Sequence, residues 1–324
     1  MRDHGGNLDG AIGRFGGQAA GWIDLSTGIN RVPYPLPGLS PAAWTTLPTK
    51  AAMERLRIAA ARAYGTKTAI LPVAGAQAAI QIVPRLDPPG HARVLAPTYN
   101  EHAAALRSAG WQVEEVAEPG DLAGADLAVL VNPNNPDGRY LPPLDVLALA
   151  SRVGRLIVDE SFADPYPAMS VASQAGHEGM IVLRSFGKFY GLAGLRLGFV
   201  LGADADIAAL SDMAGPWPVS GVAIEVGSAA LADRQWALET TARLMTETAR
   251  LDALAEVAGW TFQGGTALFR LYDTGDAQVA QERLALAHIW SRIFPYSTGW
   301  IRLGLPGGEA EWARVANALM AGGD

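Results

Sequence analysis

The sequence predicts an α/β protein with a mainly parallel sheet sandwiched by helices and a smaller α+β domain at the C-terminal end. Short apolar runs alternate with segments of helical periodicity, and polar or glycine-rich loops follow those runs. The residue pattern changes after Pro218, where it predicts mostly helix. We therefore expect an N-terminal arm over 1–30, a large domain over 31–220 and a small domain over 221–324.

Composition narrows the classes of function. Hydrophobic residues make up 49% of the 324 residues and charged residues 18%, so a large core is expected. The net charge of -7, with no Lys/Arg block, argues against a nucleic-acid partner. The sequence has no cysteine, which excludes thiolate catalysis and zinc–thiolate sites, and we predict no metal site. A polar N-terminus and the lack of a long apolar run predict a cytoplasmic protein without a membrane partner.

The first two thirds of the chain predict strands separated by helices. The predicted strands cover 69–73, 93–97, 111–116, 126–131, 155–161, 180–186 and 198–202. Helical spacing falls at 76–86, 101–108 and 143–154. Strand and helix repeated in this way predict a parallel sheet, in which ligands gather at the carboxyl ends of the strands.

The last third predicts a different arrangement. Residues 219–258 are mostly helical, and further helices are expected at 277–288 and from Glu309 onward. The apolar stretches WTFQGGTALFRLY (260–272), HIWSRIF (288–294) and GWIRLGL (299–305) predict strands. This mixture favours a smaller α+β domain.

The loop SFGKFYGLAGLRLG (185–198) places a lysine between two predicted core strands. A lone Lys188 could be a solvated side chain at a loop tip, but the glycines around it allow a close approach to a ligand. An amine held beside a second cation and away from water has a lowered pKa and can attack an aldehyde. Ser185 and Arg196 could grip a phosphate. An aldehyde that carries a phosphate describes pyridoxal 5′-phosphate (PLP).

Other strand-end residues fit the same cofactor. Asp159 ends a predicted buried strand and is either a capping carboxylate or the partner that keeps a pyridine nitrogen protonated. Asn135, in NPNNPDG, is an ordinary turn residue or an amide donor to the ring oxygen. Tyr99 is a core residue or stacks on the ring. Gly75-Ala76-Gln77 opens a helix directly after a strand, where free N–H groups can bind phosphate.

Taken in order, the motifs G-A-Q, P-T-Y, N-P-N-N-P-x-G, D-E and S-x-x-K-x-x-G-x-x-G-x-R resemble those of the fold type I PLP-dependent enzymes. More closely, they are similar to the aminotransferase class I/II family over nearly the whole chain. The resemblance implies PLP as the cofactor, a homodimer, and an N-terminal arm over the active site. The roles it implies are a Schiff base at Lys188, a pyridine partner at Asp159, a ring-oxygen contact at Asn135, stacking at Tyr99, phosphate contacts at Ser185, Arg196, Gly75, Ala76 and Gln77, and substrate carboxylate binding at Arg302.

Two positions depart from the family pattern. Family members usually carry a tyrosine three residues after the aspartate, where this chain has Phe162, which cannot donate to the ring oxygen. Many also place a tyrosine of the neighbouring subunit on the phosphate. The matching position here is Leu47, which has no hydroxyl, so the contribution of a second subunit to the phosphate site is in doubt.

Five further stretches resemble one subgroup, the threonine-phosphate decarboxylases of cobalamin biosynthesis. They are HGGN (4–7), DLSTGIN (24–30), GPWPVS (215–220), GGTALFRL (264–271) and IWSR (289–292). The resemblance implies that L-threonine O-3-phosphate, a small phosphorylated amino acid, loses CO2 to give (R)-1-aminopropan-2-ol O-2-phosphate. It implies that Arg292 holds the substrate phosphate with His4 near it and that Asn30 contacts the substrate. Gly28 departs from relatives that carry asparagine there.

Other functions stay open from the sequence. A histidinol-phosphate aminotransferase needs the same lysine and the same carboxylate-binding arginine, so the core motifs do not separate it from a decarboxylase. Non-enzyme alternatives are a PLP-fold protein that binds a ligand without turnover, or an assembly subunit. A nucleotide-binding Rossmann protein is disfavoured, because no G-x-G-x-x-G follows a first strand.

Overall fold

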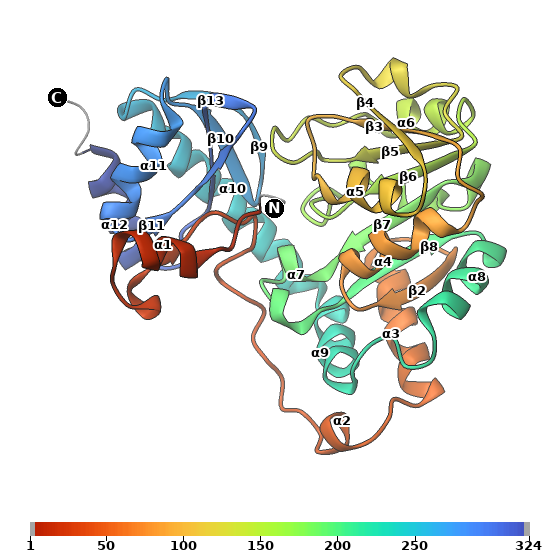
Figure 1. Ribbon diagram of the computed structural model, residues 1–324. Coiled ribbons are helices and arrows are strands. Elements are labelled where there is room, and N and C mark those ends of the chain that lie inside the picture. The colour runs from red at the N-terminus through yellow and green to blue at the C-terminus, as the bar shows by residue number, and fades with distance from the viewer. Residues whose placement is uncertain (1–3, 321–324) are drawn as a thin grey trace. The chain divides into compact units, whose positions relative to one another are not determined.

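The computed structural model describes residues 4–320, which divide into two compact units (Figure 1). The sheet unit contains residues 34–135 and 139–237. The described part of the terminal unit contains residues 4–33, 136–138 and 238–320. Each unit has its own sheet and is described by itself.

The sheet unit is built on a seven-stranded sheet with the order β2-β8-β7-β6-β5-β3-β4. Its strands are β2 (Ala69–Val73), β3 (His91–Leu95), β4 (Gln112–Val116), β5 (Leu127–Val131), β6 (Arg155–Asp159), β7 (Ile181–Ser185) and β8 (Gly198–Gly202). Strands β7, β6, β5, β3 and β4 pair in parallel, and β8 runs antiparallel to both β7 and β2. The carboxyl ends of β2, β3, β5, β6 and β7 therefore meet at one edge of the sheet.

Helices connect these strands. They are α2 (Ala42–Thr45), α3 (Lys50–Ala63), α4 (Ala76–Ile82), α5 (Glu101–Ser108), α6 (Pro143–Ala150), α7 (Phe186–Phe189), α8 (Asp204–Ala214) and α9 (Gly221–Ala232). Short 3₁₀ turns lie at Val83–Arg85, Pro119–Leu122, Pro167–Met169, Ala172–Gln174, His177–Gly179 and Ala193–Leu195. The predicted strand–helix alternation and the mainly parallel sheet are confirmed. Among residues 4–320, no helix combines the length and apolar character needed to cross a bilayer.

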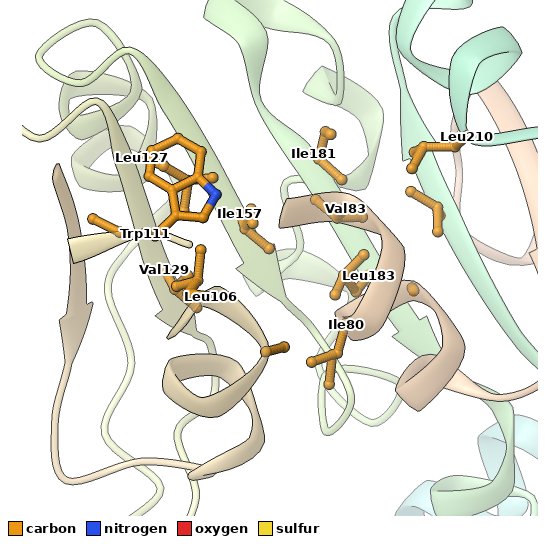
Figure 2. Close-up of a cluster of buried hydrophobic side chains, with 14 of the residues drawn as sticks. Ile80, Val83, Leu106, Trp111, Leu127, Val129, Ile157, Ile181, Leu183 and Leu210 are labelled. Carbon is orange, nitrogen blue, oxygen red and sulfur yellow. The ribbon is translucent and has the colours of Figure 1, made fainter. Parts of the chain in front are cut away.

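Figure 2 shows the core cluster of the sheet unit that packs on one face of the sheet. Alternate residues of the central strands point to this face because side chains alternate along a strand. The sheet contributes Leu127, Val129, Ile157, Ile181 and Leu183, and the covering segments contribute Ile80, Val83, Leu106, Trp111 and Leu210. Trp111 also donates its indole N–H to the carbonyl of Pro84 at 2.8 Å, so its polar atom is satisfied inside the core.

The terminal unit has an antiparallel sheet with the order β12-β13-β10-β9. Its strands are β9 (Thr261–Thr266), β10 (Phe269–Asp273), β12 (Arg292–Phe294) and β13 (Ser297–Gly304), and a separate parallel pair joins β1 (Ile23–Asp24) to β11 (Ile289–Trp290). Its helices are α1 (Leu8–Phe15), the 3₁₀ turn Ala19–Gly21, residues 238–257 of α10 (Arg234–Val257), α11 (Ala277–Leu286) and α12 (Glu309–Met320). This agrees with the α+β composition predicted for the last third of the chain.

The compact units do not follow the expected domain limits at residues 30 and 220. The N-terminal segment joins the terminal unit, because β1 pairs with β11 in register Ile23 to Ile289. Helix α9 stays with the sheet unit, because it packs closely on α3. A Cβ at Gly227 would lie 3.1 Å from Cδ1 of Leu56, so glycine lets the two helices approach.

A substitution at Leu127 tests this description of the core. Leu127 is fully buried, so Leu127→Ala leaves a cavity and is expected to lower the free energy of unfolding by about 2–5 kcal/mol. Leu144→Ala is the matched control, because Leu144 is 79% exposed and should change that energy by under about 0.5 kcal/mol. Urea denaturation of the two variants makes the comparison. Equal losses in both would contradict this account of the core.

Candidate active site

A cavity of about 150 Å³ lies at the edge of the sheet where the parallel strands end. Every residue that the sequence predicts for cofactor binding lines it: Gly75, Ala76, Gln77, Tyr99, Asn135, Asp159, Ser185, Lys188 and Arg196. They come from the segments that follow β2, β3, β5, β6 and β7. The structure brings them together because parallel strands deliver their carboxyl ends to one edge.

Lys188 lies in the short helix α7 and is partly buried. Its Nζ stands 5.7 Å from the ring centroid of Phe162, which also lines the cavity and is 4% exposed. The neighbours of Lys188 anchor its turn: Phe186 stacks on Tyr190 at 4.4 Å, and Tyr190 stacks on Trp236 at 5.5 Å. The glycine-rich loop is therefore firmly packed on the side away from the cavity.

Asp159 is the buried carboxylate of the cavity, with 2% exposure. Its Oδ1 accepts hydrogen bonds from the backbone N–H of Ser161 at 2.9 Å and from Ser161 Oγ at 2.5 Å. Its Oδ2 lies 2.8 Å from Nε2 of His102. Burial by itself would raise the pKa of Asp159, but the hydrogen bond and charge of His102 and the two bonds from Ser161 lower it below its ordinary value. The carboxylate therefore stays ionised at neutral pH.

Sequence reasoning missed His102 and Ser161. His102 is 3% exposed and stands in the first turn of α5, three residues after Tyr99. The sequence does contain a signal for His102, because a histidine beside an acidic residue on the apolar side of a helix needs a hydrogen-bond partner. The identity of that partner depends on strand β6, which the sequence alone does not place beside α5.

In one corner of the cavity, the guanidinium of Arg196 lies very close to the backbone of Gly75. Gly75 precedes α4 with φ +76°, and a Cβ there would lie 2.6 Å from Nη2 of Arg196. Only glycine therefore lets the guanidinium reach this helix start. Arg196 itself has φ +53°, an uncommon conformation for a residue with a side chain. The N–H groups of α4, the guanidinium and Ser185 line one corner, a donor set suited to an anion.

A chain of side-chain hydrogen bonds holds Tyr99 at the cavity. Tyr99 donates its hydroxyl to Oε1 of Gln77 at 3.2 Å, and Nε2 of Gln77 donates to Oε2 of Glu101 at 3.2 Å. Glu101 is 7% exposed and follows Tyr99 by two residues. The side chain of Gln77 thus holds the Tyr99 hydroxyl in place, while the backbone of Gln77 lies in the first turn of α4.

The asparagines of NPNNPDG divide into two roles. Asn132 exchanges hydrogen bonds with the backbone of Leu141, and Asn134 accepts from Thr98 Oγ1 at 2.6 Å while donating to the carbonyl of Pro97. These two hold the loop beside the strand ends. Asn135 lines the cavity, whereas Asn132 and Asn134 do not.

The predicted substrate residues belong to the terminal unit. Arg292 and Arg302 stand directly opposite each other in the β12–β13 register. Arg302 is 6% exposed and donates from Nη2 to the carbonyl of Ser26 at 2.6 Å. Burial, and then repulsion by Arg292, lower the pKa of Arg302 to about 10. Like charges opposed across a strand pair are destabilising.

The HGGN segment runs close to the same serine. The N–H of Gly6 donates to Oγ of Ser26 at 2.7 Å, and a Cβ at Gly5 would collide with the Ser26 carbonyl oxygen. Close approach to a buried segment therefore requires glycine at position 5, whereas at position 6 glycine fits because its φ is +86°. His4 is exposed. Asn30 is buried, and its Oδ1 accepts from Nη2 of Arg243 at 2.8 Å.

Within residues 4–320, no group of three or more His, Asp or Glu side chains is arranged to hold a metal ion. Leu47, the position that departs from the family pattern, is 63% exposed.

Arg302 generates a pH-linked prediction. Since its pKa is lower in the folded than in the unfolded protein, its charge destabilises the folded state at every pH below about 10, by an amount on the order of 3 kcal/mol, and stability recovers as the pH rises above about 10. Arg302→Met is therefore expected to leave the melting temperature at pH 7 unchanged or higher, because it removes a buried charge.

Thermal melts at pH 7 measure this effect. Arg314→Met, at an exposed arginine of the same unit, is the control and should change the melting temperature little. A large drop in the melting temperature of Arg302→Met would contradict the prediction.

Comparison with known proteins agrees with this geometry. A relative from Sinorhizobium sp., named threonine-phosphate decarboxylase, is 44% identical and covers 98% of this chain and 97% of its own length. A relative of the same name from Pseudomonas aeruginosa is 44% identical, covering 99% and 98%. The solved histidinol-phosphate aminotransferase of Sinorhizobium meliloti, in complex with pyridoxal-5′-phosphate, has a TM-score of 0.81 at 22% identity, with 97% of this chain and 93% of that chain covered.

The family model for aminotransferase class I and II matches residues 43–319. That match includes the whole set of strand ends around Lys188 and the strand pair that carries Arg292 and Arg302. The protein therefore belongs to the class I and II aminotransferase family.

Proposed function

We propose that this protein uses PLP to decarboxylate L-threonine O-3-phosphate to (R)-1-aminopropan-2-ol O-2-phosphate, a step of cobalamin biosynthesis. One observation carries the reaction: the 44% identity, over nearly the full chain, to two threonine-phosphate decarboxylases. The fold alone would not distinguish it from transamination, because one fold supports several reactions.

The residues of the cavity fit PLP. An amine (Lys188), a buried ionised carboxylate (Asp159) and an anion-binding corner (Gly75 with Arg196) surround one space. These are the groups that an aldehyde, a pyridine nitrogen and a phosphate require. The close approach of Arg196 to Gly75, which any Cβ would block, supports the phosphate assignment.

When bound, PLP supplies an electron sink for the bonding pair left by the departing CO2. The chain's residues bind and orient it. Lys188 would hold the aldehyde carbon, Asp159 would keep a proton on the pyridine nitrogen, and Asn135 would donate to the ring oxygen. Tyr99 would pack on the ring, and the phosphate would be held by Ser185, Arg196 and the backbone of Gly75, Ala76 and Gln77.

Phe162 changes the environment of the lysine. A tyrosine at this position would offer a hydroxyl, whereas Phe162 presents only its ring to Nζ of Lys188. Asn135 would then be the side-chain donor to the ring oxygen. After CO2 leaves, a proton must reach the α-carbon, and Nζ of Lys188 is the amine of the cavity that can deliver it.

The paired arginines of the terminal unit would bind the substrate's two anionic groups. We assign the carboxylate to Arg302 and the phosphate to Arg292, with His4 and Asn30 as further substrate contacts. The lowered pKa of Arg302 supports this assignment, because a bound carboxylate would relieve the cost of the buried charge.

We also propose a homodimer. Support comes from large apolar side chains that the sheet unit exposes: Leu36 at 69%, Trp44 at 70%, Leu47 at 63% and Trp217 at 53%. Two-fold symmetry is the common arrangement of soluble oligomers. Since Leu47 has no hydroxyl, the second subunit would contribute apolar contact at this position. The cytoplasmic location expected from the sequence stays a prediction.

Carbon dioxide release tests the reaction. Holoenzyme incubated with L-threonine O-3-phosphate is expected to release CO2 in proportion to the amine formed. Lys188→Ala should lose the visible absorption band of the bound cofactor and slow turnover by about 10²-fold or more. Transfer of the amino group to a 2-oxo acid, with no CO2 released, would show an aminotransferase instead.

Light scattering during gel filtration tests the dimer. The wild type is expected at twice the 34.0 kDa of one chain, and Trp44→Glu combined with Leu47→Glu should shift it to the monomer. Leu144→Glu, on α6, is the control for a charge added at an exposed leucine and should leave the mass unchanged. A wild type of monomer mass would refute the dimer.

A further inference from the structure

A buried ionic cluster lies behind the cavity wall, at the ends of β6 and β7. It consists of Arg184, Glu160 and Asp164 and is called here the Arg184 cluster. Nη1 of Arg184 donates to Oε2 of Glu160 at 2.8 Å, and Nη2 donates to Oδ1 of Asp164 at 2.8 Å. The exposed fractions of the three side chains are 4%, 0% and 7%. The cluster is thus shielded from solvent.

Strand geometry ties the cluster to the cavity. Arg184 directly precedes Ser185, and Glu160 directly follows Asp159. Ser185 and Asp159 line the cavity, whereas their two charged neighbours do not. Because successive side chains of a strand point to opposite faces, the ion pair joins β6 to β7 on the face away from the cavity. The ion pair therefore holds the two strands together at the point where their ends reach the cavity.

The cluster also reaches the segment around Lys188. The guanidinium of Arg184 lies 4.3 Å from the ring centroid of Tyr64. Burial and then the charge of Asp164 raise the pKa of Tyr190, which places Tyr190 near the cluster. Tyr190 stacks on Phe186, and these two residues flank Lys188 on either side in sequence.

Stability does not account for these charges. Burying an ion pair costs each ion its hydration, and replacing such pairs by apolar residues is often neutral. The Arg184 cluster has two acids for one base, and among residues 4–320 its Nε has no hydrogen-bond partner. What three fixed charges provide is geometry: a planar guanidinium that bridges two carboxylates holds both at a set distance and angle.

We propose that the Arg184 cluster positions the cofactor-binding groups, by fixing Asp159 and the segment Ser185–Lys188 relative to each other. Arg184, Glu160 and Asp164 are positioning residues, which act through Asp159, Ser185 and Lys188 and touch neither cofactor nor substrate. The inference rests on the proposed function, because it takes the cavity to be the PLP site.

The chain contains a matched control at the other end of β6. Arg155, the first residue of that strand, also bridges two acids. It donates to Asp87 and, at 3.0 and 3.1 Å, to the carboxylate of Asp206, and its side chain is 12% exposed. None of these residues lines the cavity. This Arg155 cluster has the same charges at the amino edge of the sheet, with its two carboxylates 36% and 18% exposed.

Two charge-free triple variants make the comparison. Glu160→Gln, Asp164→Asn and Arg184→Met together remove the charges of one cluster, and the two amides keep the shape of the carboxylates they replace. Asp87→Asn, Asp206→Asn and Arg155→Met do the same for the other. Apoenzyme of each is titrated with PLP, followed by its visible absorption. Thermal melting and hydrogen exchange over 159–164 and 185–190 are measured on the same apoenzymes.

The Arg184 triple variant is expected to bind PLP at least tenfold more weakly and to exchange at least tenfold faster in those two segments. The Arg155 triple variant should change neither by more than twofold, even where the melting temperatures fall equally. If the first variant does not fold, Arg184→Lys replaces it, since lysine keeps the charge but cannot bridge two carboxylates as a fork.

Equal losses of PLP affinity in both triple variants, or a loss in neither, would overturn the positioning role. The proposed reaction can be refuted independently of the positioning role. A wild type that binds PLP but releases no CO2 refutes decarboxylation, and the comparison of PLP affinities still decides the role of the cluster. A wild type that binds no PLP would overturn both.

Discussion

The pairing of β6 with β7 at their carboxyl ends is the constraint on which the rest of the site depends. In this register Asp159 stands opposite Leu183, and the ladder continues to Glu160, whose N–H donates to the carbonyl of Leu183. A shift of one residue would turn the cavity-lining side chains to the opposite face and bring Glu160 and Arg184 into the cavity. The apolar face of the same strands, through Ile157 and Leu183, holds the register in place.

Buried charge is distributed unevenly over the molecule, and its placement follows function. Asp159 is buried but accepts three hydrogen bonds, so that it stays ionised in the cavity. Arg302 is buried opposite another arginine, at a cost that a bound anion would offset. Such an arrangement lowers stability in the free protein and favours the ligand, as functional sites commonly do.

Much of this could be predicted from the sequence. The strands and helices of the sheet unit follow from apolar runs of strand length alternating with helical periodicity, and helix α5 begins at Glu101 and ends at Ser108 as predicted. The members of the cavity were predictable too, because the parallel topology sends every strand end to one edge. Motif spacing then selected Lys188 and Asp159 from the other polar residues of those loops.

Some partners of those residues could not be predicted. His102 meets Asp159 only because α5 and the end of β6 pack together, whereas Ser161 contacts Asp159 locally, two residues along the chain. Nothing in NPNNPDG says that Asn134 holds the loop while Asn135 lines the cavity. The domain limits also depended on packing, since β1 pairs with β11 from the far end of the chain.

The sequence by itself determined the element order, the parallel sheet and the chemistry collected at its edge, because periodicity and motif spacing are local properties of the chain. Only the tertiary structure decided which charges meet. The Arg184 cluster depends on the register of β6 and β7, which is set by packing between segments that are distant in sequence. The opposition of Arg292 to Arg302 depends on the register of the β12–β13 hairpin.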